Sequence, residues 1–434
     1  MRFKLGLALA AAAISTTQLT QAGELSPVEQ QIVAAIKAHN GEAVALLERA
    51  AKINSGTLNL KGVRDVGAVF RQQFDELGFK TKWIDMPPEM GRAGHLVATR
   101  SGTQGKRLLL LGHMDTVFEA DSTAPLWQLD GDGVRGQGVS DMKAGDVAII
   151  EALRALKQVG ALDNTTISVM FTGDEEEAGN PKTVSRGPMV ELAKGADIAL
   201  SFEGMVHDSN HQPRATVARR ATASFELEVK GRQGHSSAVF SPGAGYGAVY
   251  EAARILDAFR QQVPEQGLTF NPGLILGGTD VSFDAANSKG SAAGKTNVIA
   301  NTVTVKGDLR YLDYPQRDRA QAKMRAIVAN SLPGASASIS FRDSYPPMAV
   351  TPGNLKVLEA YSQASADAGL GAVGAVPAES RGAGDIQFVA PYIDSLDGLG
   401  ASGSGAHSPN ERLQLASMQE AAIRTAILIY RLTR

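Results

Sequence analysis

The chain of 434 residues contains no cysteine, so disulfide bonds and thiolate metal ligands are both excluded. Any metal site must therefore use histidine, aspartate and glutamate, and histidine occurs only seven times. Beyond the first 22 residues no apolar run is long enough to cross a bilayer, which argues against a permanent membrane span. No stripe of basic residues stands out either, so nucleic acid and anionic membranes are not expected partners.

The first 22 residues have the organisation of an export signal. Arg2 and Lys4 form a basic start, residues 5–14 are apolar, and Thr20-Gln21-Ala22 offers the small residues that a signal peptidase prefers. We expect cleavage after Ala22 and a periplasmic or secreted protein. An uncleaved anchor is the alternative, but the apolar run is short for one. The remaining chain, with 41 basic and 45 acidic side chains, would depend on its hydrophobic core for stability.

Most of the chain alternates between strand-like and helix-like segments. A strand that is buried on both faces is predicted at residues 107–112, which contain the apolar run LLLLG. Two more strands are predicted from β-rich runs at 165–171 and 196–202. Helices are predicted at 26–52, 62–77, 142–159 and 416–432 from the spacing of apolar residues and from glycines at their ends. This alternation predicts an α/β fold with a doubly wound, mostly parallel sheet.

The pattern changes near residue 214. Phe225, Leu227 and Val229 alternate with polar residues, which is typical of a strand with one wet face. Further elements follow: helices at 244–262 and 315–332, and strands at 267–276, 302–311 and 336–341. This order predicts a smaller α+β domain of the ferredoxin type, inserted into the larger one. We therefore expect a signal peptide at 1–22, a catalytic domain at 23–213 and 346–434, and an inserted lid or dimerisation domain at 214–345.

Metal-ligand residue types follow the three predicted core strands. His113-Met114-Asp115 ends the first, Asp174-Glu175-Glu176-Glu177 the second, and Glu203 the third. Two more candidates are Asp141, at the start of the next helix, and His407, in a glycine-rich segment. Functional groups of open α/β sheets gather at the carboxyl ends of strands, so we expect these side chains to converge.

The candidate set meets the needs of two zinc ions that share one carboxylate. Each ion needs a histidine and a terminal carboxylate of its own, and the set His113, His407, Glu176, Glu203 and Asp141 supplies these with one carboxylate to share. Asp115 could orient His113, and Glu175 is left over as a general base.

Each residue also has a simpler interpretation. Asp141 could be only a helix N-cap, and His113 only a buried core histidine. His407 could be a loop residue beside a helix-capping signature at Ser408-Pro409-Asn410-Glu411. Five coincidences at one sheet edge are much less probable than one, so we favour the metal site.

At these residues the sequence resembles the co-catalytic zinc exopeptidases, which include glutamate carboxypeptidase (carboxypeptidase G type), aminoacylase, succinyl-diaminopimelate desuccinylase and peptidase T. Seven motifs carry the resemblance, in the family's order and across nearly the whole mature chain. They are GHMDTVF (112–118), GQGVSDMKAG (136–145), FTGDEEEAG (171–179), SFEG (201–204), GRQGHSS (231–237), KTNVIAN (295–301) and GAHS (405–408).

The resemblance implies a role for each candidate. His113 and Glu203 would bind one zinc ion, Glu176 and His407 the other, with Asp141 as the bridge. Glu175 would be the base that activates water. In the inserted domain, His235 resembles a histidine that reaches across a homodimer to stabilise the oxyanion, and Asn297 and Arg310 resemble binders of the substrate carboxylate. Cobalt or manganese could replace zinc.

Two departures from the family pattern leave alternatives open. The stretch DEEE lengthens the usual spacing, so Glu176 and Glu177 are the alternative pair of base and ligand. The late segment SRGAGDIQF (380–388) differs from the Gly-Gly-Thr-Asp form of glutamate carboxypeptidases. We expect hydrolysis of a small peptide next to its C-terminal carboxylate, with an aminoacylase acting on N-acyl amino acids as the alternative. A zinc-containing exported binding protein without catalysis is the alternative from another class.

Overall fold

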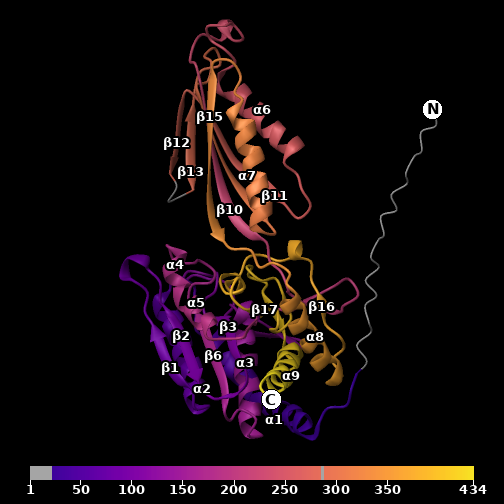
Figure 1. Cartoon of the computed structure of the whole chain (residues 1–434). Coiled ribbons are helices and arrows are strands. Elements are labelled where there is room, and N and C mark those ends of the chain that lie inside the picture. The colour runs from indigo at the N-terminus through magenta and orange to yellow at the C-terminus, as the bar shows by residue number, and fades with distance from the viewer. Residues whose placement is uncertain (1–21, 285–287) are drawn as a thin grey trace, which may run out of the picture.

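A computed structural model describes residues 22–284 and 288–434 of the chain. The predicted signal peptide, apart from Ala22, lies outside these residues. Within the described part, no helix combines the length and the apolar character needed to cross a membrane. Figure 1 shows a larger part that contains the described N-terminal residues and the C-terminus, and a second, elongated part that projects from it.

The larger part is built on a six-stranded sheet. The strand order is β1-β2-β6-β3-β7-β17. Strands β6, β3, β7 and β17 run parallel to one another, β2 runs antiparallel to β6, and β1 pairs antiparallel with β2 at the edge. The edge strands were not predicted. The strands span Lys80–Ile84 (β1), His95–Arg100 (β2), Gln104–His113 (β3), Thr165–Thr172 (β6), Ile198–Ser201 (β7) and Asp394–Leu396 (β17).

Helices cover both faces of this sheet (Figure 1). Leu108 and Leu110 of β3 face a core formed with α1, α2, α3 and α9, whereas Leu109 and Leu111 face a second core that includes α5. The C-terminal α9 packs against α1 and α3 although α1 begins the described chain. The helices span Pro27–Ala51 (α1), Leu60–Glu76 (α2), Ala144–Gln158 (α3), Lys182–Ser185 (α4), Gly187–Lys194 (α5), Pro352–Asp367 (α8) and Leu415–Leu432 (α9).

Local sequence accounts for where the first of these helices begins. Ser26 and Glu29 form a reciprocal capping box, and Pro27 occupies the first turn, where its missing N–H has no intrahelical partner. The helix starts within a residue of the predicted position. Apolar residues at helical spacing, including Ile32, Ile36 and Leu47, then turn one face into the core.

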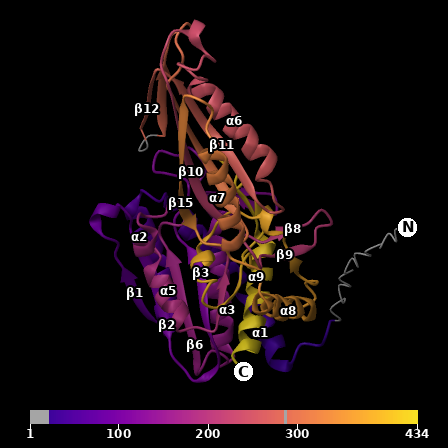
Figure 2. The same cartoon turned by 45° about the horizontal axis from the view of Figure 1, so that its top comes forward.

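The projecting part has a separate hydrophobic core. Its antiparallel sheet has the order β11-β14-β10-β15, and α6 and α7 pack on one face (Figure 2). A hairpin of β12 and β13, which was not predicted, extends it. The elements span Ala221–Gly231 (β10), Gly247–Gln262 (α6), Thr269–Gly278 (β11), Asp280–Asp284 (β12), Lys289–Ala293 (β13), Thr302–Tyr311 (β14), Tyr314–Ala329 (α7) and Ala335–Tyr345 (β15).

The two parts join where β10 begins and β15 ends. Arg219 and Met348 form a β-bridge there, and residues 213–216 still pair with residues of the larger part. The chain thus leaves the larger part near residue 220, a few residues after the expected boundary at 214. Short strands complete the larger part: Gln128–Asp130 (β4), Gly133–Arg135 (β5), Val206–His207 (β8), Pro213–Ala215 (β9), Gly374–Ala375 (β16), Gly403–Ser404 (β18) and Arg412–Gln414 (β19).

Candidate metal centre

Three adjacent strands bring their ends to one edge of the large sheet. β3 lies between β6 and β7, with His113 beside Thr172 and Leu111 beside Ser201. Glu175 and Glu203 follow the ends of β6 and β7 by a few residues, so their side chains reach the same level as His113. This convergence follows from parallel strands in register.

His113 is buried at the end of β3, and its two ring nitrogens have different surroundings. Nδ1 lies 3.0 Å from the carbonyl oxygen of Asp115, which can only accept a hydrogen bond. This contact places the proton on Nδ1 and leaves the lone pair of Nε2 available. Nε2 lies 3.3 Å from Asp141 Oδ1 and 3.7 Å from Glu203 Oε1. A cation among these three atoms would have one nitrogen and two oxygen ligands.

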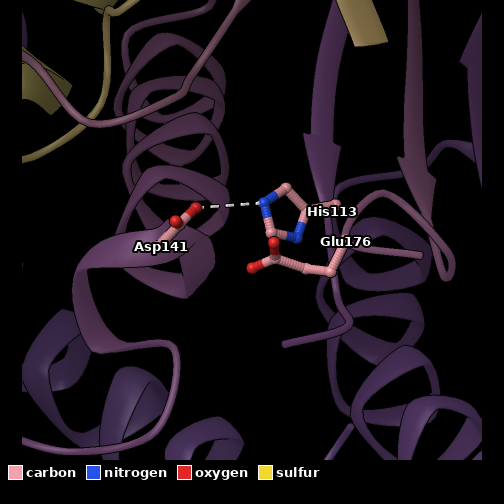
Figure 3. A group of neighbouring side chains, drawn as sticks. All are labelled: His113, Asp141 and Glu176. Carbon is pink, nitrogen blue, oxygen red and sulfur yellow. Dashed lines mark hydrogen bonds and ion pairs between the residues drawn. The ribbon is translucent and has the colours of Figure 1, made fainter. Parts of the chain in front are cut away.

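Asp141 lies across the site from the strand ends (Figure 3). Its Oδ1 faces His113, and its Oδ2 lies 3.1 Å from Nε2 of His407. Burial alone would raise the pKa of Asp141, but the nearby imidazoles of His113 and His407 outweigh burial and hold this pKa well below its ordinary value. The helix α3 begins only at Ala144 and its N-cap is Lys143, so the N-cap interpretation of Asp141 is wrong.

His407 and Glu176 form the other half of the cluster. Nε2 of His407 lies 3.1 Å from Glu176 Oε2, and these contacts with Asp141 and Glu176 raise the pKa of His407 to about 11. Figure 3 shows the Glu176 carboxylate directed into the space between His113 and Asp141. The backbone of His407 is in the left-handed region, with φ of 62°. Residues other than glycine rarely adopt this conformation, and those that do are often found at functional sites.

Glu175 and Glu203 both lie close to His113 in the first half of the cluster, which is the half around His113. Burial and the nearby Glu203 raise the pKa of Glu175 well above its ordinary value, and burial and Asp141 raise the pKa of Glu203 to about 8. His113 forms two compact groups of potential metal ligands, one with Asp141 and Glu176 and one with Glu175 and Glu203. Buried carboxylates this close repel each other unless cations lie among them, so the donor set fits two divalent metal ions.

Glu177 lies outside the cluster. Its carboxylate pairs with Arg92 at 2.7 Å, and its backbone carbonyl accepts a second hydrogen bond from the same guanidinium. The side chain of Glu177 is 61% exposed. This placement favours Glu175 and Glu176, rather than Glu176 and Glu177, as the pair in the site.

Asp115 connects His113 to the loop after β6. Its two carboxylate oxygens accept hydrogen bonds from the backbone N–H groups of Glu175, at 3.0 Å, and Glu176, at 3.1 Å. Thr57 donates a third at 2.7 Å, and Nδ1 of His113 lies 3.5 Å from Asp115 Oδ1. The buried carboxylate of Asp115 therefore positions His113, at the end of β3, and also the loop after β6 that carries Glu175 and Glu176.

Replacement of Asp115 with alanine should weaken metal binding by about 10–100-fold, because His113, Glu175 and Glu176 lose a common support. Competition with a chromogenic chelator would measure the affinity, with circular dichroism to verify the fold. Asp121→Ala, at an exposed loop position, is the matched control. Equal affinities of the two variants would show that Asp115 does not position the ligands.

Glu411 has a role that the sequence did not indicate. The proposed capping signature at 408–411 is wrong, because β19 follows it and α9 begins only at Leu415. Instead, the buried Glu411 carboxylate accepts hydrogen bonds from the backbone N–H groups of Gly138, Ser140 and Asp141. It thereby fixes the loop that carries Asp141.

A cavity of about 320 Å³ opens on the cluster. The carboxylates Asp141, Glu175, Glu176 and Glu203 line it together with His407. Two arginines that the sequence did not identify as site residues, Arg219 and Arg381, also line it. The only sequence signal for Arg381 was the unusual SRGAGDIQF segment.

The three candidates of the inserted domain lie elsewhere. Arg310 is in β14 near the junction and pairs with Asp308 at 2.9 Å. His235 lies beyond the opposite end of β10, where its backbone forms an isolated β-bridge with Val298. Asn297, which is next to Val298, accepts a backbone hydrogen bond from Ser236. β10 has eleven residues, and the ten steps between them span roughly 33 Å at about 3.3 Å per step, so His235 and Asn297 are far from the cluster of their own chain.

Comparison with known proteins identifies the family. A model of peptidase family M20/M25/M40 matches residues 109–431, which include every residue of the cluster. The chain belongs to this family. The resemblance that the seven motifs predicted is therefore confirmed, and the protein is a hydrolase of the M20 metallopeptidase and amidohydrolase type.

Individual relatives are similar over most of the chain. Carboxypeptidase G2 of Pseudomonas sp. (strain RS-16) is 27% identical over 84% of this chain and 83% of its own length. Succinyl-diaminopimelate desuccinylase of Delftia acidovorans is 26% identical over 79% and 86%, respectively. The protein also shares its fold with the crystal structure of aminopeptidase PepT of Bacillus cereus, with a TM-score of 0.72 and 19% sequence identity. The match covers 91% of the present chain and 99% of the PepT chain.

Proposed function

We propose that this M20 enzyme is an exported dinuclear zinc peptidase that hydrolyses an amide bond next to a free C-terminal carboxylate. The observation that carries the proposal is the division of the cluster into two halves that share Asp141, whose two oxygens face His113 and His407. Glu203 completes one half and Glu176 the other. Glu175 lines the same cavity and is the carboxylate not needed for this ligand set.

Zinc suits the donor set of imidazole and carboxylate groups, and cobalt or manganese are substitutes with similar ligand preferences. When bound, two divalent ions would polarise the substrate carbonyl and make water more acidic. In this proposal, His113 and Glu203 would hold one ion, His407 and Glu176 would hold the other, and Asp141 would be the carboxylate available to both.

Proton transfer is assigned to Glu175. Its carboxylate takes a proton from the water whose oxygen attacks the amide carbon. As the carbon–nitrogen bond breaks, Glu175 returns a proton to the leaving nitrogen, so one water is consumed per bond cleaved.

The similarity to carboxypeptidase G2 supports a glutamate-carboxypeptidase-like activity. An aminoacylase is the alternative, since an N-acyl amino acid has the same amide next to a free carboxylate. The similarity to succinyl-diaminopimelate desuccinylase does not decide between the two activities, because that relative is 26% identical and carboxypeptidase G2 is 27% identical. Export after Ala22 would favour scavenging of external peptides over a biosynthetic reaction.

The proposal includes a homodimer formed through the inserted domain. His235 and Asn297 lie too far along β10 to reach the cluster of their own chain, so a second copy would be needed to bring them to it. Sedimentation velocity of the mature protein would detect this dimer.

A substrate panel tests the proposed activity. Purified, metal-loaded protein should release the C-terminal residue from dipeptides or from folyl-glutamate, detected by mass spectrometry. Exclusive hydrolysis of N-acetyl amino acids would identify the aminoacylase instead. Bound metal without hydrolysis of any panel member would support a binding protein.

A further inference from the structure

The guanidinium of Arg381 lies inside the candidate catalytic cavity. It lines the same 320 Å³ space as Glu175, Glu203 and Asp141. Its Nε is buried and has no hydrogen-bond partner among the described residues, and no ion pair to Arg381 is found among them either. Burial of an unsatisfied charged donor costs free energy, so such a group requires an explanation.

The surrounding structure holds Arg381 in place. The buried Arg219 donates from Nη1 to the carbonyl oxygens of Gly382, at 2.6 Å, and Ala383, at 3.2 Å. Arg219 is in turn fixed by Asp397, which accepts from its Nε at 2.7 Å. These hydrogen bonds hold the loop after Arg381 against Arg219, which also lines the cavity, and so position the Arg381 backbone beside the cluster.

The charges of the cavity leave Arg381 unmatched. The carboxylate of Asp397 offsets Arg219, and the four lining carboxylates of the cluster would offset two divalent ions. Arg381 lies close enough to Asp397, Glu203 and Asp141 to interact with their charges, but no direct ion pair of Arg381 with these described carboxylates is found. The remaining charge in the cavity is one guanidinium, which is complementary to one carboxylate.

We propose that Arg381 binds the free carboxylate of the substrate and thereby selects for amides that have one. This inference rests on the proposed function and specifies its substrate recognition. A carboxylate can accept from Nε and a terminal nitrogen of the guanidinium at the same time, which would satisfy the buried Nε. Arg310 is a weaker candidate in this conformation, because Asp308 already occupies its guanidinium.

Matched acids and amides test the assignment. Probes are equimolar mixtures of N-acetyl amino acids and dipeptides, each with its C-terminal carboxamide counterpart. Wild-type holoenzyme should hydrolyse acids at least about 100-fold faster than amides in kcat/KM, because a site built for a carboxylate rejects the analogue lacking it. Arg381→Met should lose most of this preference, mainly through a higher KM for the acids, and Arg381→Lys should be intermediate.

Metal content and circular dichroism of each variant keep the test interpretable, and Arg49→Met, on the exposed surface of α1, is the control. A second readout uses calorimetry on Glu175→Gln protein with the fastest acid of the mixture and its carboxamide. Addition of Arg381→Met should weaken binding of the acid and leave binding of the carboxamide unchanged.

The outcomes separate the two proposals. Hydrolysis with the acid preference intact in Arg381→Met would overturn the Arg381 assignment and leave the peptidase proposal standing. No hydrolysis of any probe by metal-loaded wild type would overturn both.

Discussion

Glu175→Gln should lower kcat by about 10²–10⁴-fold, with bound metal and fold unchanged. Glutamine has nearly the same shape as glutamate but accepts no proton at neutral pH. Glu175 lies in the cavity beside Glu203, and its backbone remains anchored to Asp115 through the hydrogen bond at 3.0 Å. Steady-state kinetics and elemental analysis of the same preparation would measure both quantities.

Glu177→Gln is the control for this prediction, since it makes the same chemical change two residues away. Glu177 pairs with Arg92 on the surface, so activity should change little. Loss of activity in Glu177→Gln, with Glu175→Gln active, would restore the alternative assignment of base and ligand. Loss of metal from Glu175→Gln would instead make Glu175 a ligand, as its proximity to His113 and Glu203 allows.

Arg186→Met should lower the free energy of unfolding by about 3–5 kcal/mol. Arg186 is 1% exposed and donates to Asp385 at 2.6 Å and to the carbonyl oxygen of Asp174 at 2.9 Å, and it also pairs with the Asp174 carboxylate. The substitution would leave two carboxylates buried without their cation. Asp174 precedes Glu175, so the same network also supports the loop that carries Glu175.

Urea unfolding followed by circular dichroism would measure this loss. Arg64→Met removes an exposed pair with Asp85 and should cost less than about 1 kcal/mol. Combination of Arg186→Met with Asp174→Asn and Asp385→Asn should recover part of the lost stability, because no buried charge then remains unpaired. Equal losses in Arg186→Met and Arg64→Met would contradict the role assigned to the network.

The sequence was sufficient to predict the site wherever a ligand follows a long apolar strand. β3 and β6 are buried on both faces, and their apolar runs located both strands within three residues at either end. Because parallel strands end at one edge, the proximity of His113, Glu175 and Glu203 followed from strand order alone.

Weak local patterns account for the elements that were missed. The edge strand β1, KTKWI, is short, and it has no buried residue among its five. The β12–β13 hairpin is mostly exposed: β12, DVSFD, alternates over only five residues, and β13, KGSAA, has no apolar alternation that distinguishes it from a loop. Such strands are stabilised mainly by their pairing partners, which a single segment does not reveal.

Long-range polar contacts were equally inaccessible. Arg219 and Asp397 are 178 residues apart, and Glu411 contacts Asp141 across 270 residues. No local motif connects such pairs. For His235 and Asn297 the resemblance supplied a role, but the fold places them at the far end of β10, so this role would require the proposed dimer.

Metal stoichiometry and activity, measured together through a cycle of chelation and reconstitution, test the central claim most directly. We predict two divalent ions per chain, loss of hydrolysis as they are removed, and recovery of hydrolysis when zinc is restored. Hydrolysis that persists in metal-free protein, or a purified protein that binds no divalent ion at its cluster, would contradict the account.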